Sequence, residues 1–156
     1  MKLQKATAFA LYAVLELAAE PGRQRTAVEI AEKYGISAHH LAKVLRDLGR
    51  AGLVDAVRGV GGGYRFAGNA KRLTLMDVIS LFEETGVEAE EPVPPGEGQD
   101  IAAGLRFLLA ELDAQIGATL RSISLSTMLK LIARRPWEGV AEIKPTRRTQ
   151  TARRAR

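Results

Sequence analysis

The chain of 156 residues contains no cysteine, and this absence excludes several kinds of chemistry. Disulfide bonds, thiolate metal sites and cysteine nucleophiles all require a sulfur atom that this sequence does not provide. Aromatic residues make up only 5% of the chain, although hydrophobic residues make up 46%. A core of ordinary single-domain size must therefore consist mainly of leucine, isoleucine, valine and alanine.

Long apolar runs are also missing, since no stretch approaches the roughly 18 residues that a membrane span requires. The basic start of the N-terminal segment and its apolar continuation are typical of a signal peptide, which is the competing interpretation. Glu16 and Glu20 instead leave one apolar face on a helix, and no clear small-residue cleavage site follows. We therefore expect a cytoplasmic protein without a membrane segment.

Charge is distributed unevenly along the chain. Residues 1–72 hold twelve lysines and arginines against six aspartates and glutamates, residues 73–143 hold five against twelve, and residues 144–156 hold six against none. A basic front, an acidic middle and a basic tail indicate that only part of the protein faces a polyanion. Ordinary surface charge is the alternative.

Apolar periodicity predicts three helices in the first third of the chain, over residues 7–20, 27–34 and 38–51. Pro21 and Gly22 end the first. Thr26 and Glu29 have the spacing of a capping box for the second, and Gly35 stands where a left-handed residue ends it. Ser37 is expected to cap the third. The inward-facing residues predicted for these helices are Phe9, Leu11, Tyr12, Val14, Leu15 and Leu17, then Val28, Ile30 and Ala31, then Leu41, Val44, Leu45 and Leu48.

Two short strands, over residues 54–58 and 64–67, flank a run of glycines and predict a hairpin with a flexible tip. Thr74 is expected to cap a helix over residues 75–84, with the help of Asp77. A Pro/Gly/Glu-rich segment follows, and then a long helix over residues 101–123. Its apolar residues recur every three or four positions, as in the seam for a partner helix: Ile101, Leu105, Leu108, Leu112, Ile116, Leu120 and Ile123. Ser124 or Ser126 caps a short last helix that ends near Arg134.

This pattern predicts a mainly α fold with a small β wing: a winged helix-turn-helix followed by a long C-terminal dimerisation helix. Four segments are expected. Residues 1–84 form the winged helix-turn-helix DNA-binding domain, and residues 85–100 form an acidic loop. Residues 101–136 hold the dimerisation helix and the last helix, and residues 137–156 form a basic, disordered tail.

The strongest functional pattern is the helix, tight turn, helix and glycine hairpin of residues 26–67. The turn leaves the second helix protruding, as suits insertion into a DNA major groove. The exposed positions expected on that helix are Ala38, His39, His40, Lys43, Arg46, Asp47 and Arg50. Arg58, at the base of the hairpin, is in position to reach a minor groove or a phosphate. A winged-helix module that binds proteins rather than DNA is the competing hypothesis.

Several further residues follow the same order as a known family: Tyr12-Ala13, Glu29-Ile30-Ala31, Ile36-Ser37, Ala51-Gly52-Leu53-Val54, Arg58-Gly59, Gly62-Gly63-Tyr64 and Asp77-Val78-Ile79. In these positions the chain resembles the Rrf-type family of winged-helix regulators, which includes IscR and NsrR. The resemblance is close over residues 1–84 and concerns only the architecture over residues 101–134. It implies a homodimer joined through the long helix and bound to an imperfect palindrome in double-stranded DNA.

By position, the resemblance gives Ser37, Ala38, His39 and Lys43 as recognition-helix contacts and Arg58-Gly59 as wing contacts. Together with the exposed residues above, the candidate DNA-binding set is Thr26, Ser37, Ala38, His39, His40, Lys43, Arg58, Gly59 and Tyr64. The candidate dimer interface is Ile101, Leu105, Leu108, Leu112, Ile116 and Leu120. The expected function is that of a sequence-specific regulator, acting as a repressor.

The chain departs from the family at the cofactor. The family's best-known members hold an iron–sulfur cluster with three cysteines in the segment before the long helix, and residues 86–100 contain none. We therefore expect no cluster and no other cofactor. Ala56 also replaces a serine that the family often has before the wing. An alternative is a regulator that senses a small molecule bound between the winged domain and the dimer helices.

Other chemistry has little support. His39 and His40 are neighbours that point about 100° apart on a helix, so DNA or solvent contact is favoured over metal binding. The acidic residues between Glu83 and Glu97 match no cation-binding loop and are interpreted as a solvated segment. The sequence offers no convincing catalytic constellation, and we expect no enzyme. The arginines of residues 147–156 could neutralise phosphates without sequence preference, or simply solubilise the chain.

Overall fold

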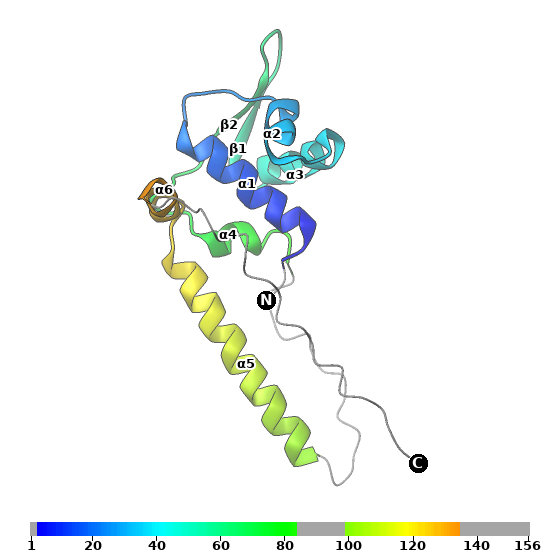
Figure 1. The fold of residues 1–156 in the computed structure, drawn as a ribbon, viewed down its shortest axis with the longest axis vertical. Helices are drawn as coiled ribbons and strands as arrows, with labels where there is room; N and C mark the ends of the chain where they lie inside the picture. Colours follow the sequence, from blue (N-terminus) through cyan, green and yellow to red (C-terminus); the bar gives the residue numbers. More distant parts are fainter. Residues whose placement is uncertain (1–2, 84–98, 135–156) are drawn as a thin grey trace.

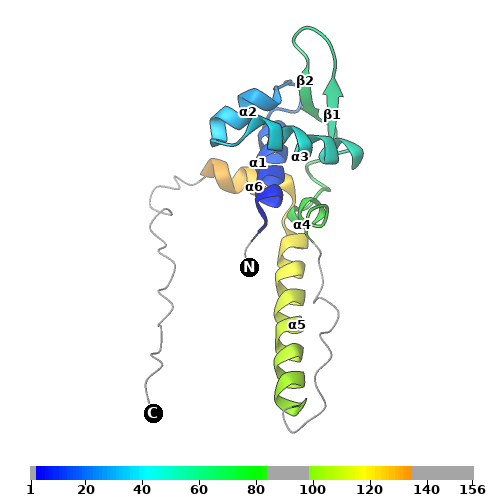
Figure 2. The same cartoon turned by 90° about the vertical axis from the view of Figure 1, so that its right-hand side faces the viewer.

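The structure is a computed structural model that describes residues 3–83 and 99–134. Figure 1 shows its elements: α1 (Lys5–Ala19), α2 (Ala27–Tyr34), α3 (Ala38–Arg50), β1 (Val54–Val57), β2 (Gly63–Phe66), α4 (Leu75–Ile79), α5 (Gln99–Ser122) and α6 (Leu125–Arg134). In both views, α2, α3 and the hairpin gather at one end of the molecule, and α5 extends from the other (Figures 1 and 2). Among the described residues, no helix is both long enough and apolar enough to cross a membrane.

A single aliphatic core lies between α1, α3 and the elements around them. Leu41, Leu45 and Leu48 of α3 are fully buried and pack with Val14 and Leu17 of α1. The inward face predicted for α3 is therefore confirmed. Two other predicted inward residues are exposed: Tyr12 lies outside the core on α1, and Val28 faces solvent on the first turn of α2. Small residues, mainly alanines, form much of the buried face of α1, which brings it close to its neighbours.

Helix α2 has both of the ends that its sequence predicts. The Thr26 hydroxyl accepts a hydrogen bond from the Glu29 backbone N–H at 3.1 Å, and the Glu29 carboxylate accepts one from the Thr26 backbone N–H at 2.6 Å. Gly35 ends the helix in the left-handed region, at φ 63°. The Ile36 backbone N–H then donates to the Ala31 carbonyl at 2.8 Å, which closes the turn into α3.

Helix α3 starts in a different way from the prediction. Ser37 has the extended backbone of an N-cap residue, but its hydroxyl makes no capping hydrogen bond. The start of the helix is defined by the closed turn after Gly35 and by the Ser37 carbonyl, which accepts from the Leu41 backbone N–H at 3.0 Å. The hydroxyl predicted as a cap is thus not used by the helix.

The hairpin is a two-stranded antiparallel sheet in which Val54 pairs with Phe66 and Val57 with Gly63. The segment before α2 extends it, because the Arg25 backbone N–H donates to the Tyr64 carbonyl at 2.9 Å and the Tyr64 N–H donates to the Arg25 carbonyl at 2.8 Å. A Cβ on Gly63 would stand 2.6 Å from the Arg25 carbonyl oxygen, so only glycine permits this pairing. The α1–α2 loop therefore holds β2 of the wing at Gly63 and Tyr64.

Helix α4 has the predicted Thr74–Asp77 capping box but ends at Ile79, five residues before the predicted end. The chain turns after Ile79, and the Glu83 carboxylate reaches the start of α1. There it accepts from the Gln4 backbone N–H at 2.7 Å and from the Thr7 hydroxyl at 2.6 Å. These contacts to a distant part of the chain draw the segment away from the helical path.

The last helix belongs to the same packed unit as the winged elements. Ser124, rather than Ser126, caps α6, since its hydroxyl accepts from the Thr127 backbone N–H at 3.1 Å. The Leu125 N–H donates to the Leu73 carbonyl at 2.8 Å, and the Leu125 side chain is fully buried in the core. The acidic loop expected over residues 85–100 is shorter than predicted, because Gln99 and Asp100 already belong to α5. Residues 85–98 and the tail expected over residues 137–156 lie outside the described residues.

Candidate DNA-binding interface

One face of α3 is buried and the other carries polar side chains to solvent. His39, His40, Lys43 and Arg46 are exposed, and Ala38 is half-buried. Within the described residues, the side chains of this face make one hydrogen bond, from Arg50 to Asp47 at 3.3 Å. The remaining donors on this helix are therefore available to a partner.

The two histidines do not form a metal site in the described part of the chain. Their ring centroids are 6.0 Å apart with planes tilted by 60°, and no cluster of three metal-ligating side chains occurs there. A pair on adjacent helical positions diverges in direction. This geometry suits two separate contacts along a surface rather than joint coordination of one ion.

Thr26 differs from the other candidate contacts, because its hydroxyl already has partners in its own helix. It accepts from the Glu29 N–H and donates to the Glu29 carboxylate at 3.0 Å. These hydrogen bonds lower the pKa of Glu29 below its ordinary value, the backbone N–H of Thr26 contributing most. The side chain that the sequence places among DNA contacts thus serves the fold at the start of α2.

The wing presents Arg58 and a nearly bare backbone. Arg58 is exposed where β1 ends, and Gly59 follows it at φ 109°, a conformation that L side chains rarely adopt. Tyr64 lies in β2 opposite Ala56, half-buried, and packs against the core. Arg58 and Gly59 thus lie at the tip end of β1, and not at the base of the hairpin where the sequence analysis expected Arg58, while Tyr64 is tied to the body by its pairing with Arg25.

Sequence analysis did not predict a buried ionic network between α1 and the end of α2, because it treated Glu16 as a surface residue of the first helix. Glu16 is buried and accepts from Lys33 Nζ at 2.7 Å and from the Tyr34 hydroxyl at 2.8 Å. Arg25 lies 3.4 Å from the same carboxylate. Burial alone would raise the pKa of Glu16, but the hydrogen bonds from Lys33 and Tyr34 and the charges of Lys33 and Arg25 lower it overall.

Burial and the hydrogen bond to Glu16 raise the pKa of Tyr34 to about 12. The ring of Tyr34 also stacks on Tyr12 of α1, with centroids 5.1 Å apart and planes 12° from parallel. Together these contacts fix the angle between α1 and the end of α2. They therefore support the turn from which α3 begins.

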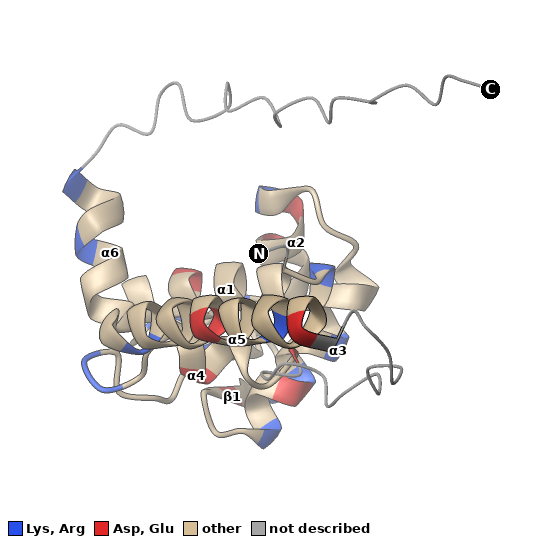
Figure 3. Ribbon diagram, turned by 90° about the horizontal axis from the view of Figure 1, so that it is seen from below, with Lys and Arg blue, Asp and Glu red and all other residues tan. Residues whose placement is uncertain are grey.

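The basic residues of α6 lie away from this face. Figure 3 views the molecule from below, and it shows α6 and α3 on opposite sides of α1. Lys130 and Arg134 of α6 thus do not continue the surface formed by Lys43 and Arg46. A DNA duplex that lies along α3 would therefore contact the basic residues of α3 and not those of α6.

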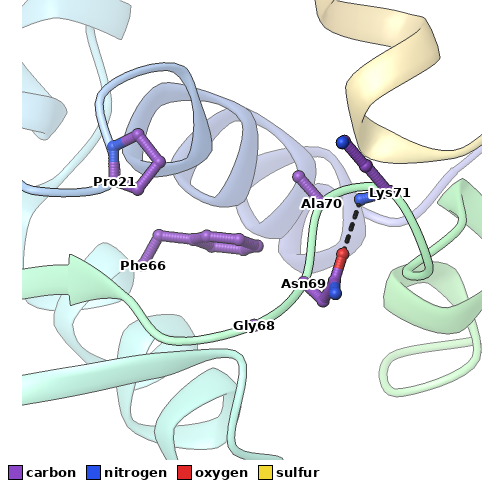
Figure 4. A pocket seen from close by; sticks show the side chains of 6 residues that line it. All are labelled: Pro21, Phe66, Gly68, Asn69, Ala70 and Lys71. Atoms are coloured by element: carbon purple, nitrogen blue, oxygen red, sulfur yellow. Dashed lines mark hydrogen bonds between the residues drawn. The ribbon is translucent and has the colours of Figure 1, made fainter.

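The described residues also line an open hollow of about 420 Å³ beside the β2–α4 turn. Figure 4 shows its lining, with Pro21 and Phe66 on one side and Asn69 to Lys71 on the other. The Asn69 side chain accepts a hydrogen bond from the Lys71 backbone N–H at 3.0 Å, so it stabilises its own turn. This hollow lies beside the β2–α4 turn and not between the winged domain and α5. The effector site expected between the winged domain and α5 therefore stays a prediction.

A capped helix, a closed turn, a protruding second helix and a glycine-tipped hairpin define a winged helix-turn-helix protein. Comparison with known proteins then gives the family. The family model described as Rrf2, "Iron-dependent Transcriptional regulator", matches residues 3–131. The chain belongs to the Rrf2 family, as the motifs in its sequence indicate.

The relatives and solved structures agree. The putative HTH-type transcriptional regulator BadM of Rhodopseudomonas palustris is 53% identical over 132 residues, which are 85% of this chain and 83% of that protein. CymR, the global cysteine regulator of B. subtilis, superposes with a TM-score of 0.70 at 25% identity, covering 84% of this chain and 98% of CymR. IscR of T. potens gives 0.64 at 25% identity, covering 86% and 92%. The chain is therefore a DNA-binding transcriptional regulator and not an enzyme.

An iron–sulfur cluster needs ligands from the protein. The whole sequence contains no cysteine, so it provides none of the thiolates that hold a conventional iron–sulfur cluster. The residues of this chain therefore do not fit that cofactor.

Proposed function

We propose that this Rrf2-family regulator binds a palindromic operator as a homodimer and acts as a repressor, without an iron–sulfur cluster. The observation that carries the proposal is the polar face of α3, which is exposed and hardly used by the fold. Ser37, Ala38, His39, His40 and Lys43 lie on its first two turns or at its start. The N-terminal turns of a recognition helix are the part that contacts base edges in the major groove.

The wing supplies the second contact. Arg58 is a charged donor at the end of β1, and Gly59 allows the backbone to approach DNA closely. Arginine at such a position binds phosphates or enters a minor groove. The Ser37 hydroxyl and the backbone N–H groups of the first turn of α3 add neutral donors for phosphate at a helix N-terminus.

A homodimer is supported by the surface of α5. Ile101, Leu105, Leu108, Leu112 and Ile116 recur on one side of this helix, with exposed fractions from 37% to 80% in the single chain. Leu120 continues the row and is already half-buried, close to where α5 meets α4. Leu109 widens the exposed row, although sequence reasoning left it out. Such a row buries its apolar surface when the same helix of a second copy packs against it.

Two-fold symmetry then places the two α3 helices about 34 Å apart on successive major grooves, which calls for a palindromic operator. A compact dimer on such a site blocks access to a promoter that overlaps it. Repression is therefore the sign of regulation that we propose.

The test is binding of the purified full-length protein to DNA from upstream of its own gene and to a scrambled control, across a salt titration. A second protein that ends at Ile143 removes the basic tail. We expect both proteins to prefer the native fragment and the full-length protein to show the steeper salt dependence. Equal affinity for native and scrambled DNA, lost with the tail, would show a non-specific binder and would overturn the proposal.

The dimer is tested in the same experiment by Leu112→Glu, which puts a charge into the apolar row. We expect a monomer in sedimentation equilibrium and loss of operator binding. Ala114→Glu is the matched control, because it adds the same charge on the other side of α5. If the dimer survives Leu112→Glu but not Ala114→Glu, the interface lies on the opposite face of α5 from the one proposed. Reporter expression from the operator promoter, higher in the deletion strain, checks repression.

A further inference from the structure

The tip of the hairpin carries only one side chain. Residues 59–63 read Gly-Val-Gly-Gly-Gly, and Val60 is fully exposed. Its isopropyl group therefore adds nothing to the packing of the described chain. A lone exposed valine is common on protein surfaces, so its place in the hairpin, rather than its exposure, needs explanation.

The glycines around Val60 keep the tip narrow. Gly59 and Gly61 have φ of 109° and 77°, and a Cβ on Gly62 would stand 2.4 Å from the Val57 carbonyl oxygen. The Gly62 backbone N–H donates to the Gly59 carbonyl at 2.9 Å and closes the turn. Side chains are thus excluded from both sides of Val60 by the conformation of the turn itself.

This shape matches the minor groove of DNA. The minor groove is about 6 Å wide, so a turn of glycines around one small side chain can bring that side chain to the groove, whereas larger neighbouring side chains would keep it out. Figure 2 shows that the hairpin projects from the molecule at the end opposite to α5, beyond α3. With α3 in the major groove, the wing therefore meets the flanking DNA.

The chemistry of the groove floor gives this contact a preference. A·T and G·C pairs both present acceptors there, but only G·C adds an amino donor, from N2 of guanine. Valine has no acceptor for that donor, and a donor covered by an apolar group loses its bond to water. An aliphatic tip therefore fits A·T pairs better than G·C pairs.

We propose that Val60 enters the minor groove beside each half-site and makes the regulator prefer A·T pairs there. This inference rests on the proposed function, since it needs an operator on which α3 is seated. It assigns a specificity-determining residue in addition to those of α3 and to Arg58.

The experiment uses the full-length protein and an operator whose flanking pairs are replaced one at a time by A·T, G·C or I·C. Inosine lacks the guanine amino group, so I·C looks like A·T from the minor groove and like G·C from most of the major groove. We expect competition binding to give about tenfold weaker binding for G·C at the positions under the wing. I·C should bind as well as A·T.

Two variants isolate the side chain. Val60→Gly should make the three pairs equal, whatever happens to the total affinity. Val60→Thr keeps the shape but adds a hydroxyl that can accept from the guanine amino group, so G·C should come within about twofold of A·T. Val28→Thr, an exposed valine on α2, is the matched control and should keep the wild-type preference.

Three results would overturn the inference. A wild-type protein that binds all three pairs equally has no minor-groove preference. An unchanged preference in Val60→Gly would remove Val60 as its source, and I·C behaving like G·C would remove the amino group as its cause. In each of these cases specific operator binding remains, whereas a wild-type protein that binds no operator overturns the proposed function and this inference together.

Discussion

The two helices of the helix-turn-helix motif use their polar residues in opposite ways. In α2, Thr26 and Glu29 bond to each other, and Lys33 and Tyr34 bond to Glu16 of α1. In α3, Lys43 and Arg46 are exposed, and Ser37 does not cap the helix that it precedes. One helix therefore serves the fold, and the other leaves its hydrogen-bonding groups for a partner.

The difference shows how an unused polar face can indicate a binding surface. Both helices bury an apolar side, so burial alone does not separate them. What separates them is where the donors and acceptors go, because polar groups that bond inside the fold are occupied and those that do not remain available to a partner.

The buried side of α3 should affect folding and not DNA recognition. Leu45→Ala removes a fully buried side chain from the core, and we expect the free energy of unfolding to fall by about 2–5 kcal/mol. Urea denaturation followed by far-UV circular dichroism measures it. Arg46→Ala, on the exposed side of the same helix, is the control and should change stability by less than about 0.5 kcal/mol. Equal losses in the two variants would contradict the division between the faces.

The exposed side of α3 and the wing should affect DNA binding and not folding. Arg58→Ala should weaken operator binding most, by about 1–3 kcal/mol. Lys43→Ala should weaken it moderately, and the slope of log affinity against log salt concentration should become shallower by about 0.9, the value for one lost phosphate contact. Fluorescence anisotropy across a salt series measures both. Lys130→Ala, on α6 and away from α3, is the control for removing a charge. Wild-type affinity in Arg58→Ala and Lys43→Ala, with intact folding, would remove the proposed interface.

The ionic support behind α2 should appear as a pH dependence of stability. The pKa of Glu16 is lowered in the fold, so its ionised form is favoured by folding. The stability that it contributes is fully present above the ordinary value of 4.5 and is lost as pH falls through the lower folded value. Thermal unfolding between about pH 5 and pH 3 should therefore show a smaller decrease for Glu16→Gln than for the wild type.

Glu20, Glu29 and Glu83 also have lowered pKa values. They are present in the wild type and in Glu16→Gln, so both proteins should still lose some stability as the pH falls. Lys33, Tyr34 and Arg25 are the groups that face Glu16 from neighbouring elements. Identical pH profiles for Glu16→Gln and the wild type would show that the network does not support the fold through the charge of Glu16.

The local parts of this structure could be predicted from the sequence. The capping boxes at Thr26 and Thr74, the left-handed Gly35 and the inward face of α3 all depend on residues within a few positions of one another. The order of helices and the glycine hairpin then gave the winged-helix fold. Sequence rules are sufficient for features that depend on contacts between residues a few positions apart in the chain.

The contacts that position the candidate interface were missed because they join distant residues. Glu16 meets Tyr34 across 18 positions, and Gln4 meets Glu83 across 79. A glutamate on a mostly apolar helix looks like a surface residue until its partners are known. The same limit applies to Tyr64, whose place against the core depends on strand pairing with Arg25 and not on its neighbours in the sequence.

The smallest expected effect compares the two helix starts directly. Thr26→Ala removes a hydroxyl that caps α2 and should cost about 1 kcal/mol of stability, with little change in operator affinity at a temperature where both proteins are folded. Ser37→Ala removes a hydroxyl that caps nothing and should leave stability within about 0.5 kcal/mol, while operator binding weakens. Denaturation and anisotropy on the same two proteins give both readouts. If Ser37→Ala loses stability and keeps affinity, its hydroxyl serves the fold after all, and the contrast between the two helices fails where it is most local.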